Sequence, residues 1–251
     1  MTSRYNSYVI CTTPRSGSTM LCGLLSATGR AGKPESYFHV PSLERWVEAH
    51  ELVWGDYGSD RERVQAVVDA AQQTGSADTG VFGLRLQRDS FDYFMSQLAM
   101  LVPDAETDLA RIEATFGSTL FIYLTRQNKL EQAISRVKAE QTGLWHKSAD
   151  GRELERLSEP RDPIYDPEAI ERHMMNLSGL DQAWHDWFAR EGIEPRRVYY
   201  DDLANDPAKT LARILKALGL DAALADIVDV PTARLSDLVS RDWAERYRRS
   251  C

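Results

Sequence analysis

The sequence predicts an α/β fold in which a mostly parallel sheet carries helices on both faces. Short apolar, β-prone runs alternate along the chain with longer segments whose apolar residues recur every three or four positions. Strands separated by helices favour parallel pairing, because each crossover returns the chain to the same end of the sheet. A Ser- and Gly-containing turn between the first apolar run and the first helical pattern is a further feature typical of this class.

The predicted elements follow one another without a repeat or a low-complexity linker. The strand-like runs are Tyr8–Cys11, Val81–Leu86, Leu120–Thr125 and Arg197–Tyr200. The helical patterns are Ser18–Ala27, Leu43–Glu51, Arg61–Gln73, Ser90–Leu101, Asp104–Phe116, Lys129–Gln141, Pro167–Arg190, Pro207–Leu218 and Asp242–Arg249. We therefore expect a single domain over residues 1–251, with a lid or insertion at about 142–167, where charged residues and prolines gather.

The composition excludes several classes of protein. The net charge is −8, from 30 Lys and Arg against 38 Asp and Glu, which argues against non-specific nucleic-acid binding. The sequence has no run of 18 apolar residues and no apolar leader, so we expect neither a membrane span nor a secretion signal. The three cysteines, Cys11, Cys22 and Cys251, give neither a disulfide framework nor a zinc pattern, and we expect a cytoplasmic protein.

The turn after the first apolar run is predicted to bind an anion. Strand, turn and helix in this order aim backbone N–H groups and the positive end of a helix dipole at one point. The predicted anion-binding residues are Pro14, Arg15, Ser16, Gly17, Ser18 and Thr19. Ser18 follows Gly17 where an ATP- or GTP-binding loop has lysine, so the fold is P-loop-like but a nucleoside triphosphate is not the expected ligand. The alternative is a turn that only connects a strand to a helix.

A second anion site is predicted at the end of the strand-like run Leu120–Thr125. Arg126 follows this strand directly, and ligands of open α/β sheets bind at the carboxyl ends of the strands. Ser135 lies nine residues further, within the next helical pattern, and can converge with Arg126 on one phosphate. The alternative is that Arg126 caps a helix or pairs with a surface carboxylate and that Ser135 is a solvated helix residue.

Three segments resemble a known enzyme family. Pro-Arg-Ser-Gly-Ser-Thr at 14–19 resembles the 5′-phosphosulfate loop of sulfotransferases, and Arg126 with Ser135 resembles their 3′-phosphate element. The segment 197–207 resembles a strand-to-helix segment that occurs late in many sulfotransferases. Together with the C-terminal segment 240–249, these motifs make nearly the whole chain similar to the bacterial trehalose 2-sulfotransferase family.

The resemblance implies a sulfotransferase fold and a defined reaction. The donor would be 3′-phosphoadenosine-5′-phosphosulfate, the acceptor a hydroxyl of a carbohydrate or glycolipid, and the protein a homodimer that needs no metal. Two alternatives stay open. One is a kinase or NTPase of the P-loop type, and the other is a non-catalytic protein that binds a nucleotide or sulfate.

The resemblance also directs attention to the loop after the first helical pattern. Family members carry a glutamate there as the base, but Ser36 stands at that position in this chain and Glu35 precedes it. Glu35 is the favoured candidate for the base, and His39 is the alternative because an imidazole titrates near neutral pH. Arg15 is expected to stabilise charge on the leaving phosphate.

The acceptor site is expected to combine aromatic and polar side chains from loops. The candidates are Tyr37, Phe38, Arg85, Trp145 and His146. Trp184, Trp187 and Phe188 recur at helical spacing, which favours a core or a dimer interface over a sugar site. The basic segment Arg241–Arg249 is expected either to close over the adenosine of the donor or to form a solvated helix.

Overall fold

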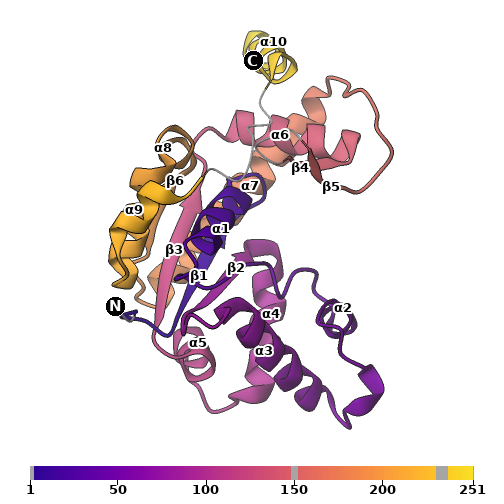
Figure 1. Ribbon diagram of the computed structural model, residues 1–251. Coiled ribbons are helices and arrows are strands. Elements are labelled where there is room, and N and C mark those ends of the chain that lie inside the picture. The colour runs from indigo at the N-terminus through magenta and orange to yellow at the C-terminus, as the bar shows by residue number, and fades with distance from the viewer. Residues whose placement is uncertain (1–2, 148–151, 230–236, 251) are drawn as a thin grey trace.

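A four-stranded parallel sheet forms the centre of the molecule (Figure 1), a computed structural model that describes residues 3–147, 152–229 and 237–250. The strands, in the order in which they pair, are β2 (Phe82–Gln87), β1 (Ser7–Thr12), β3 (Thr119–Thr125) and β6 (Arg196–Tyr199). All four predicted strands are present, displaced by no more than one residue at either end. The predicted parallel sheet is therefore confirmed.

The predicted helices are also present. They are α1 (Ser18–Ala27), α2 (Leu43–Ala49), α3 (Asp60–Ser76), α4 (Arg88–Leu101), α5 (Asp108–Phe116), α6 (Lys129–Thr142), α7 (Pro167–Arg190), α9 (Pro207–Leu218) and α10 (Leu238–Ser250). The α5 helix begins four residues later than predicted because the side chain of Thr107 caps it by accepting from the Ala110 N–H. The elements that the sequence did not predict are short: α8 (Tyr200–Asn205), the 3₁₀ helices η1 (Trp54–Asp56) and η2 (Ala222–Ile227), and two hairpin strands.

Helices cover both faces of the sheet, as the sequence predicted. On one face, Val9 and Cys11 of β1 pack into a core made with α2, α3, α4, α5 and α7. On the other face, Tyr8 and Ile10 pack against α1, α9 and η2. Because successive side chains of a strand point to opposite faces, a strand buried on both sides is mostly apolar, which is the pattern of Tyr8–Cys11 within β1.

The remaining helices lie beyond the carboxyl ends of the strands (Figure 1). A third core joins α6 to α7 and α10, and Trp243 and Ala244 of α10 are buried in it. The predicted lid segment contains an antiparallel hairpin, β4 (Leu144–Lys147) and β5 (Glu153–Arg156), directly after α6. In the sheet, Thr12 at the end of β1 lies opposite Gln87 of β2 and Leu124 of β3. The segments that follow these three strands therefore meet at one edge.

Two further features concern membrane-spanning helices and the cysteines. Over the described residues, no helix has the length and apolar character needed to span a membrane. Cys11 and Cys22 are free thiols buried in the two cores that flank the sheet, and the third cysteine, Cys251, lies outside the described residues.

Candidate active site

The loop between β1 and α1 exposes unpaired backbone donors at the edge of the sheet. Arg15 has φ 63° and Gly17 has φ 88°, so the chain turns sharply before α1 begins. The N-cap of α1 is Gly17, which has no side chain to cap the helix, and the first turn of α1 contains no acidic residue. The first N–H groups of this helix therefore lack intrahelical partners, an arrangement that favours an anion, and anion binding by this loop stays a prediction.

Gly17 is fixed by a close approach as well as by its backbone conformation. A Cβ atom at this position would lie 2.7 Å from Cδ2 of Tyr200, closer than two carbon atoms approach without a shift. Tyr200 is the first residue of α8 and also lines the cavity described below. The glycine thus lets the anion-binding loop and α8 share one wall of the site.

A buried polar network supports this loop from beneath. Gln132 of α6 is fully buried and donates from Nε2 to the Pro14 carbonyl (2.7 Å) and to Thr13 Oγ1 (3.1 Å). Asp181 of α7 accepts a hydrogen bond from Thr125 Oγ1 (2.7 Å) and forms an ion pair with Lys129. This network was missed in the sequence, although Asp181 lies on the apolar stripe of α7, where a lone carboxylate needs buried partners.

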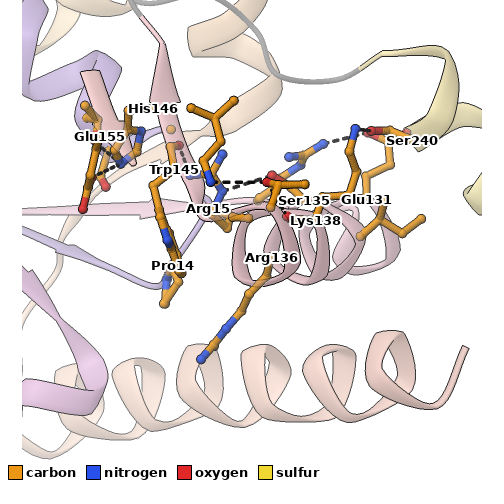
Figure 2. Close-up of a pocket in the computed structure, with 18 of the residues that line it drawn as sticks. Pro14, Arg15, Glu131, Ser135, Arg136, Lys138, Trp145, His146, Glu155 and Ser240 are labelled. Atoms are coloured by element: carbon orange, nitrogen blue, oxygen red, sulfur yellow. Dashed lines mark hydrogen bonds and ion pairs between the residues drawn. The ribbon is translucent and has the colours of Figure 1, made fainter. Parts of the chain in front are cut away.

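Arg15 extends from the loop across the cavity (Figure 2). Its Nε donates to Ser135 Oγ at 3.0 Å and its Nη1 donates to the Trp145 carbonyl at 2.6 Å. Burial, followed by the charge of nearby Arg126, lowers the pKa of Arg15 to about 10. A guanidinium group that is partly buried beside a second cation forms a site that an anion would stabilise.

Arg126 follows β3 and is buried, with 6% of its surface exposed. Its Nη2 pairs with Glu131 at 2.8 Å and its guanidinium lies 4.3 Å from the ring centre of Tyr200. The buried Nε atom has no hydrogen-bond partner within the described part of the chain. Arg126 thus pairs with a carboxylate and also lines the cavity, and its binding of a phosphate stays a prediction.

A third arginine links the loop after α1 to the loop between β1 and α1. Arg85 of β2 donates from Nε to Ser36 Oγ (2.7 Å) and from Nη1 to Thr19 Oγ1 (3.0 Å). Thr19 Oγ1 in turn lies 3.1 Å from Nε2 of His146 on β4. Thr19 therefore contacts both Arg85 and His146, although the three residues come from three separate elements.

The candidate bases lie in different surroundings. Glu35 is half-exposed, pairs with Lys33 at 3.0 Å, and is absent from the cavity wall, which Ser36 and His39 line instead. The backbone of Glu35 pairs with β2, since its carbonyl accepts from the Arg85 N–H. This pairing turns the Ser36 side chain, rather than that of Glu35, toward the cavity.

Three predicted site residues have side chains in the interior instead of the cavity. Tyr37 and Phe38 belong to the core on the α4 face of the sheet, where Phe38 is 4.8 Å from Phe94 between ring centres. The prediction that these two rings face the acceptor is corrected accordingly. The Ser16 hydroxyl is fully buried and bonds to Thr12 Oγ1, so this residue can offer an anion only its backbone.

Apart from Glu35, the other predicted side chains line one cavity of about 990 Å³. Its wall includes Pro14, Arg15, Gly17, Ser18, Thr19, Ser36, His39, Arg85, Arg126, Ser135, Trp145, His146, Arg241 and Arg248. The C-terminal helix thus presents basic side chains to the cavity while Trp243 packs against α6 and α7. Within the described ranges, no group of three or more His, Cys, Asp or Glu side chains is arranged to hold a metal ion.

Known proteins resemble this chain along its whole length. Two trehalose 2-sulfotransferases are each 29% identical to it: that of Mycobacterium tuberculosis covers 99% of this chain and 96% of its own, and that of Mycolicibacterium smegmatis covers 99% and 97%. A solved structure, the sulfotransferase domain of the olefin synthase from Synechococcus PCC 7002, is 15% identical with a TM-score of 0.43, covering 96% of this chain and 94% of its own.

A family model matches the same extent of sequence. The model is described as Stf0 sulphotransferase and matches residues 7–250, from the start of β1 to the end of α10. This range contains the anion-binding loop, Arg126, Ser135 and the hairpin that carries His146. The chain therefore belongs to the Stf0 sulphotransferase family.

Proposed function

We propose that this sulfotransferase moves a sulfuryl group from 3′-phosphoadenosine-5′-phosphosulfate to a hydroxyl of a carbohydrate or glycolipid. The observation that carries the proposal is the convergence of Arg15 and Arg126 on one cavity, beside the uncapped N-terminus of α1. Two cationic sites suit a ligand with two separated phosphate groups. The absence of lysine after Gly17 disfavours a nucleoside triphosphate.

The two ends of the donor would contact different residues. The 5′-phosphosulfate would accept from Arg15, from the first N–H groups of α1 and from the hydroxyls of Ser18 and Thr19. The 3′-phosphate would contact Arg126 and Ser135. As the reaction proceeds, negative charge grows on the oxygen that bridges phosphorus and sulfur, and Arg15 would stabilise it.

The acceptor would lie beyond Thr19, on the side of the β4–β5 hairpin. Arg85, Trp145 and His146 line the cavity there and provide hydrogen-bond donors, an acceptor nitrogen and an aromatic ring. Such a combination suits a polyhydroxyl ligand with apolar ring faces. The sulfation of trehalose by the two named relatives makes a sugar the first acceptor to test.

The location and the assembly of the protein belong to the same proposal. The donor and the free thiols Cys11 and Cys22 fit a cytoplasmic enzyme. Homodimer formation stays a prediction, which light scattering of the purified protein would test.

The decisive experiment compares nucleotide binding with sulfuryl transfer. Calorimetry with 3′-phosphoadenosine-5′-phosphate should give tight binding, whereas ATP with Mg²⁺ should bind weakly. Donor and trehalose, or a panel of sugars and glycolipids, should then give a product heavier by one sulfonate group in mass spectrometry. Tight, magnesium-dependent ATP binding would favour a kinase, and nucleotide binding without transfer to any acceptor would favour a binding protein.

A further inference from the structure

The β4–β5 hairpin brings a histidine to the end of the anion-binding loop. His146 Nε2 is 3.1 Å from Thr19 Oγ1. The carboxylate of Glu155, on the facing strand, lies 3.4 Å from the same nitrogen. Figure 2 shows the two side chains next to each other beside the stretch of cavity that Trp145 and Arg15 border. The imidazole is thus held between the loop and a carboxylate.

We propose that His146 is the general base that removes the proton of the acceptor hydroxyl, with Glu155 as its positioning residue. This inference rests on the proposed sulfuryl transfer. The acceptor oxygen forms a bond to sulfur while the bond from sulfur to the bridging oxygen of the 5′-phosphate breaks. The bridging oxygen keeps that electron pair and leaves with the 3′,5′-bisphosphate. The hydroxyl proton passes to His146 Nε2, and the imidazolium later releases it to water.

His146 is favoured by its contacts over three other candidate proton acceptors, Glu35, Glu131 and His39. Glu35 is directed to Lys33, and Glu131 is paired with Arg126. The His39 side chain is exposed at the rim, where the residue's hydrogen bonds are made by its backbone N–H and carbonyl. His146, in contrast, contacts Thr19, the last residue of the predicted anion-binding turn.

The surroundings of His146 keep its Nε2 atom unprotonated. Burial, and then the charges of Arg15 and Arg85, lower the pKa of His146 to about 4, so the imidazole is neutral near pH 7. Arg85 already donates to Thr19 Oγ1, which leaves the Thr19 hydroxyl proton free to point at Nε2. In this neutral tautomer the lone pair lies on Nε2, and the acceptor hydroxyl would replace Thr19 as its hydrogen-bond donor before the proton is transferred.

Donor binding would raise the basicity of His146. The phosphosulfate would offset the charges of Arg15 and Arg85, which are the two cations that hold the pKa down. The Glu155 carboxylate would then stabilise the imidazolium as it forms. The site would therefore gain its proton-accepting strength when the donor is in place.

The test compares His146→Gln with a matched control, His173→Gln, whose side chain lies on α7 and pairs with Glu140. Steady-state transfer to trehalose, or to the best acceptor of the panel, gives kcat, and calorimetry with 3′-phosphoadenosine-5′-phosphate gives affinity. We expect His146→Gln to lower kcat about 10²- to 10⁴-fold, the usual range for loss of general base catalysis. Its nucleotide affinity should change less than about threefold, and the control should match the wild type in both measurements.

Chemical rescue separates proton transfer from a structural role. Added imidazole should restore activity to His146→Gly by about tenfold or more, because the free base can enter the space that the side chain leaves. The inference is wrong if His146→Gln keeps a kcat within threefold of the wild type. It is equally wrong if kcat and nucleotide affinity fall together without rescue, since His146 would then shape the anion site. If the wild type binds nucleotide but sulfates no acceptor, the proposed function fails and this role fails with it.

The role of Glu155 is tested by the pH profile of kcat. Glu155→Gln should lower kcat by about tenfold and shift the acidic limb to lower pH, because an imidazolium without its carboxylate loses its proton more readily. The limb should flatten in His146→Gln. A Glu155→Gln profile with the wild-type limb would overturn the positioning role.

Discussion

Arg15 donates a hydrogen bond from Nε to Ser135 Oγ at 3.0 Å, so two residues 120 positions apart join the two predicted anion sites. Arg15 belongs to the loop after β1 and Ser135 to the second turn of α6 (Figure 2). Since Arg126 lowers the pKa of Arg15, both sites also interact through charge. A ligand with two anionic groups can neutralise both arginines at once, which no single phosphate can do as well.

Arg15→Ala is expected to weaken binding of 3′-phosphoadenosine-5′-phosphate by about 10- to 100-fold. Hydrogen bonds to charged groups contribute about 1.5–3 kcal/mol, which corresponds to this range of affinity. Calorimetry of the two proteins at the same ionic strength measures the change. Arg30→Ala is the matched control, because Arg30 is exposed beyond the end of α1 and is absent from the cavity wall. Equal losses of nucleotide affinity in the two variants would show that Arg15 does not contact the donor.

The buried network of Asp181 and Lys129 beneath the loop is expected to contribute to the stability of the folded protein. Asp181→Asn leaves Lys129 without its carboxylate partner, and removing one member of a buried ion pair costs about 3–5 kcal/mol. Urea unfolding should show this loss, while Asp186→Asn, on the exposed side of the same helix, should stay within about 0.5 kcal/mol of the wild type.

A double variant separates the ion pair from the other contacts of Asp181. Lys129→Met in the Asp181→Asn background should recover part of the lost stability, because no unpaired buried charge is left behind. If the double variant is less stable than Asp181→Asn by the full cost of Lys129→Met alone, the two side chains are not coupled and the network explanation is incorrect.

The strands and the conformation of the loop between β1 and α1 could be predicted because local sequence determines them. Tyr8 to Cys11 are apolar on both faces, and Ser18 begins a helix after a glycine that needs a positive φ. Arg126 could be placed at the cavity because a residue that ends a parallel strand must lie at that edge of the sheet. These inferences depend on chain order and need no knowledge of packing.

The acceptor side depends on tertiary contacts and was predicted less well. The sequence Glu35-Ser36-Tyr37-Phe38 suggests a carboxylate and two rings at the site, yet the carbonyl of Glu35 bonds to β2 and thereby fixes which side chains turn inward. Tyr37 and Phe38 consequently join the core. The backbone pairing between Glu35 and β2 decides which side chains of this loop face the cavity and which face the core. Because this pairing joins segments that are distant in the sequence, no local sequence pattern predicts it.

Gly17→Ala should lower the free energy of unfolding more than a glycine-to-alanine substitution at a position where a positive φ is the only cost. The added Cβ would meet the Tyr200 ring at 2.7 Å while also occupying φ 88°. We expect a loss of about 2–4 kcal/mol in urea unfolding, together with weaker nucleotide binding as the loop and α8 move apart. Gly29→Ala is the control, since φ is 60° there and the Cβ would meet nothing within 4 Å, so it should lose only about 1 kcal/mol. Equal losses of unfolding free energy in the two variants would show that the Tyr200 ring can move away from the added Cβ at no measurable cost.

Stability should fall in mild acid because of His146. In the folded protein its pKa is about 4 against an ordinary 6.5, so between these values the unfolded chain binds the proton and the folded chain does not. The contribution of His146 to the free energy of unfolding is therefore fully present above about pH 6.5 and is lost progressively as the pH falls toward 4.

The size of this effect can be isolated with one substitution. The unfolding free energy of the wild type should drop between pH 7.5 and pH 5 by about 2 kcal/mol more than that of His146→Gln. His50, whose pKa is also lowered by burial, is present in both proteins and cancels in the difference. Saturating 3′-phosphoadenosine-5′-phosphate should reduce the difference, because the bound phosphates offset Arg15 and Arg85 and allow the folded protein to take up the proton. Urea unfolding of both proteins at the two pH values, with and without the nucleotide, measures all these quantities. If the unfolding free energies of both proteins fall by the same amount between the two pH values without nucleotide, His146 has the same pKa in the folded and unfolded states and this prediction is wrong.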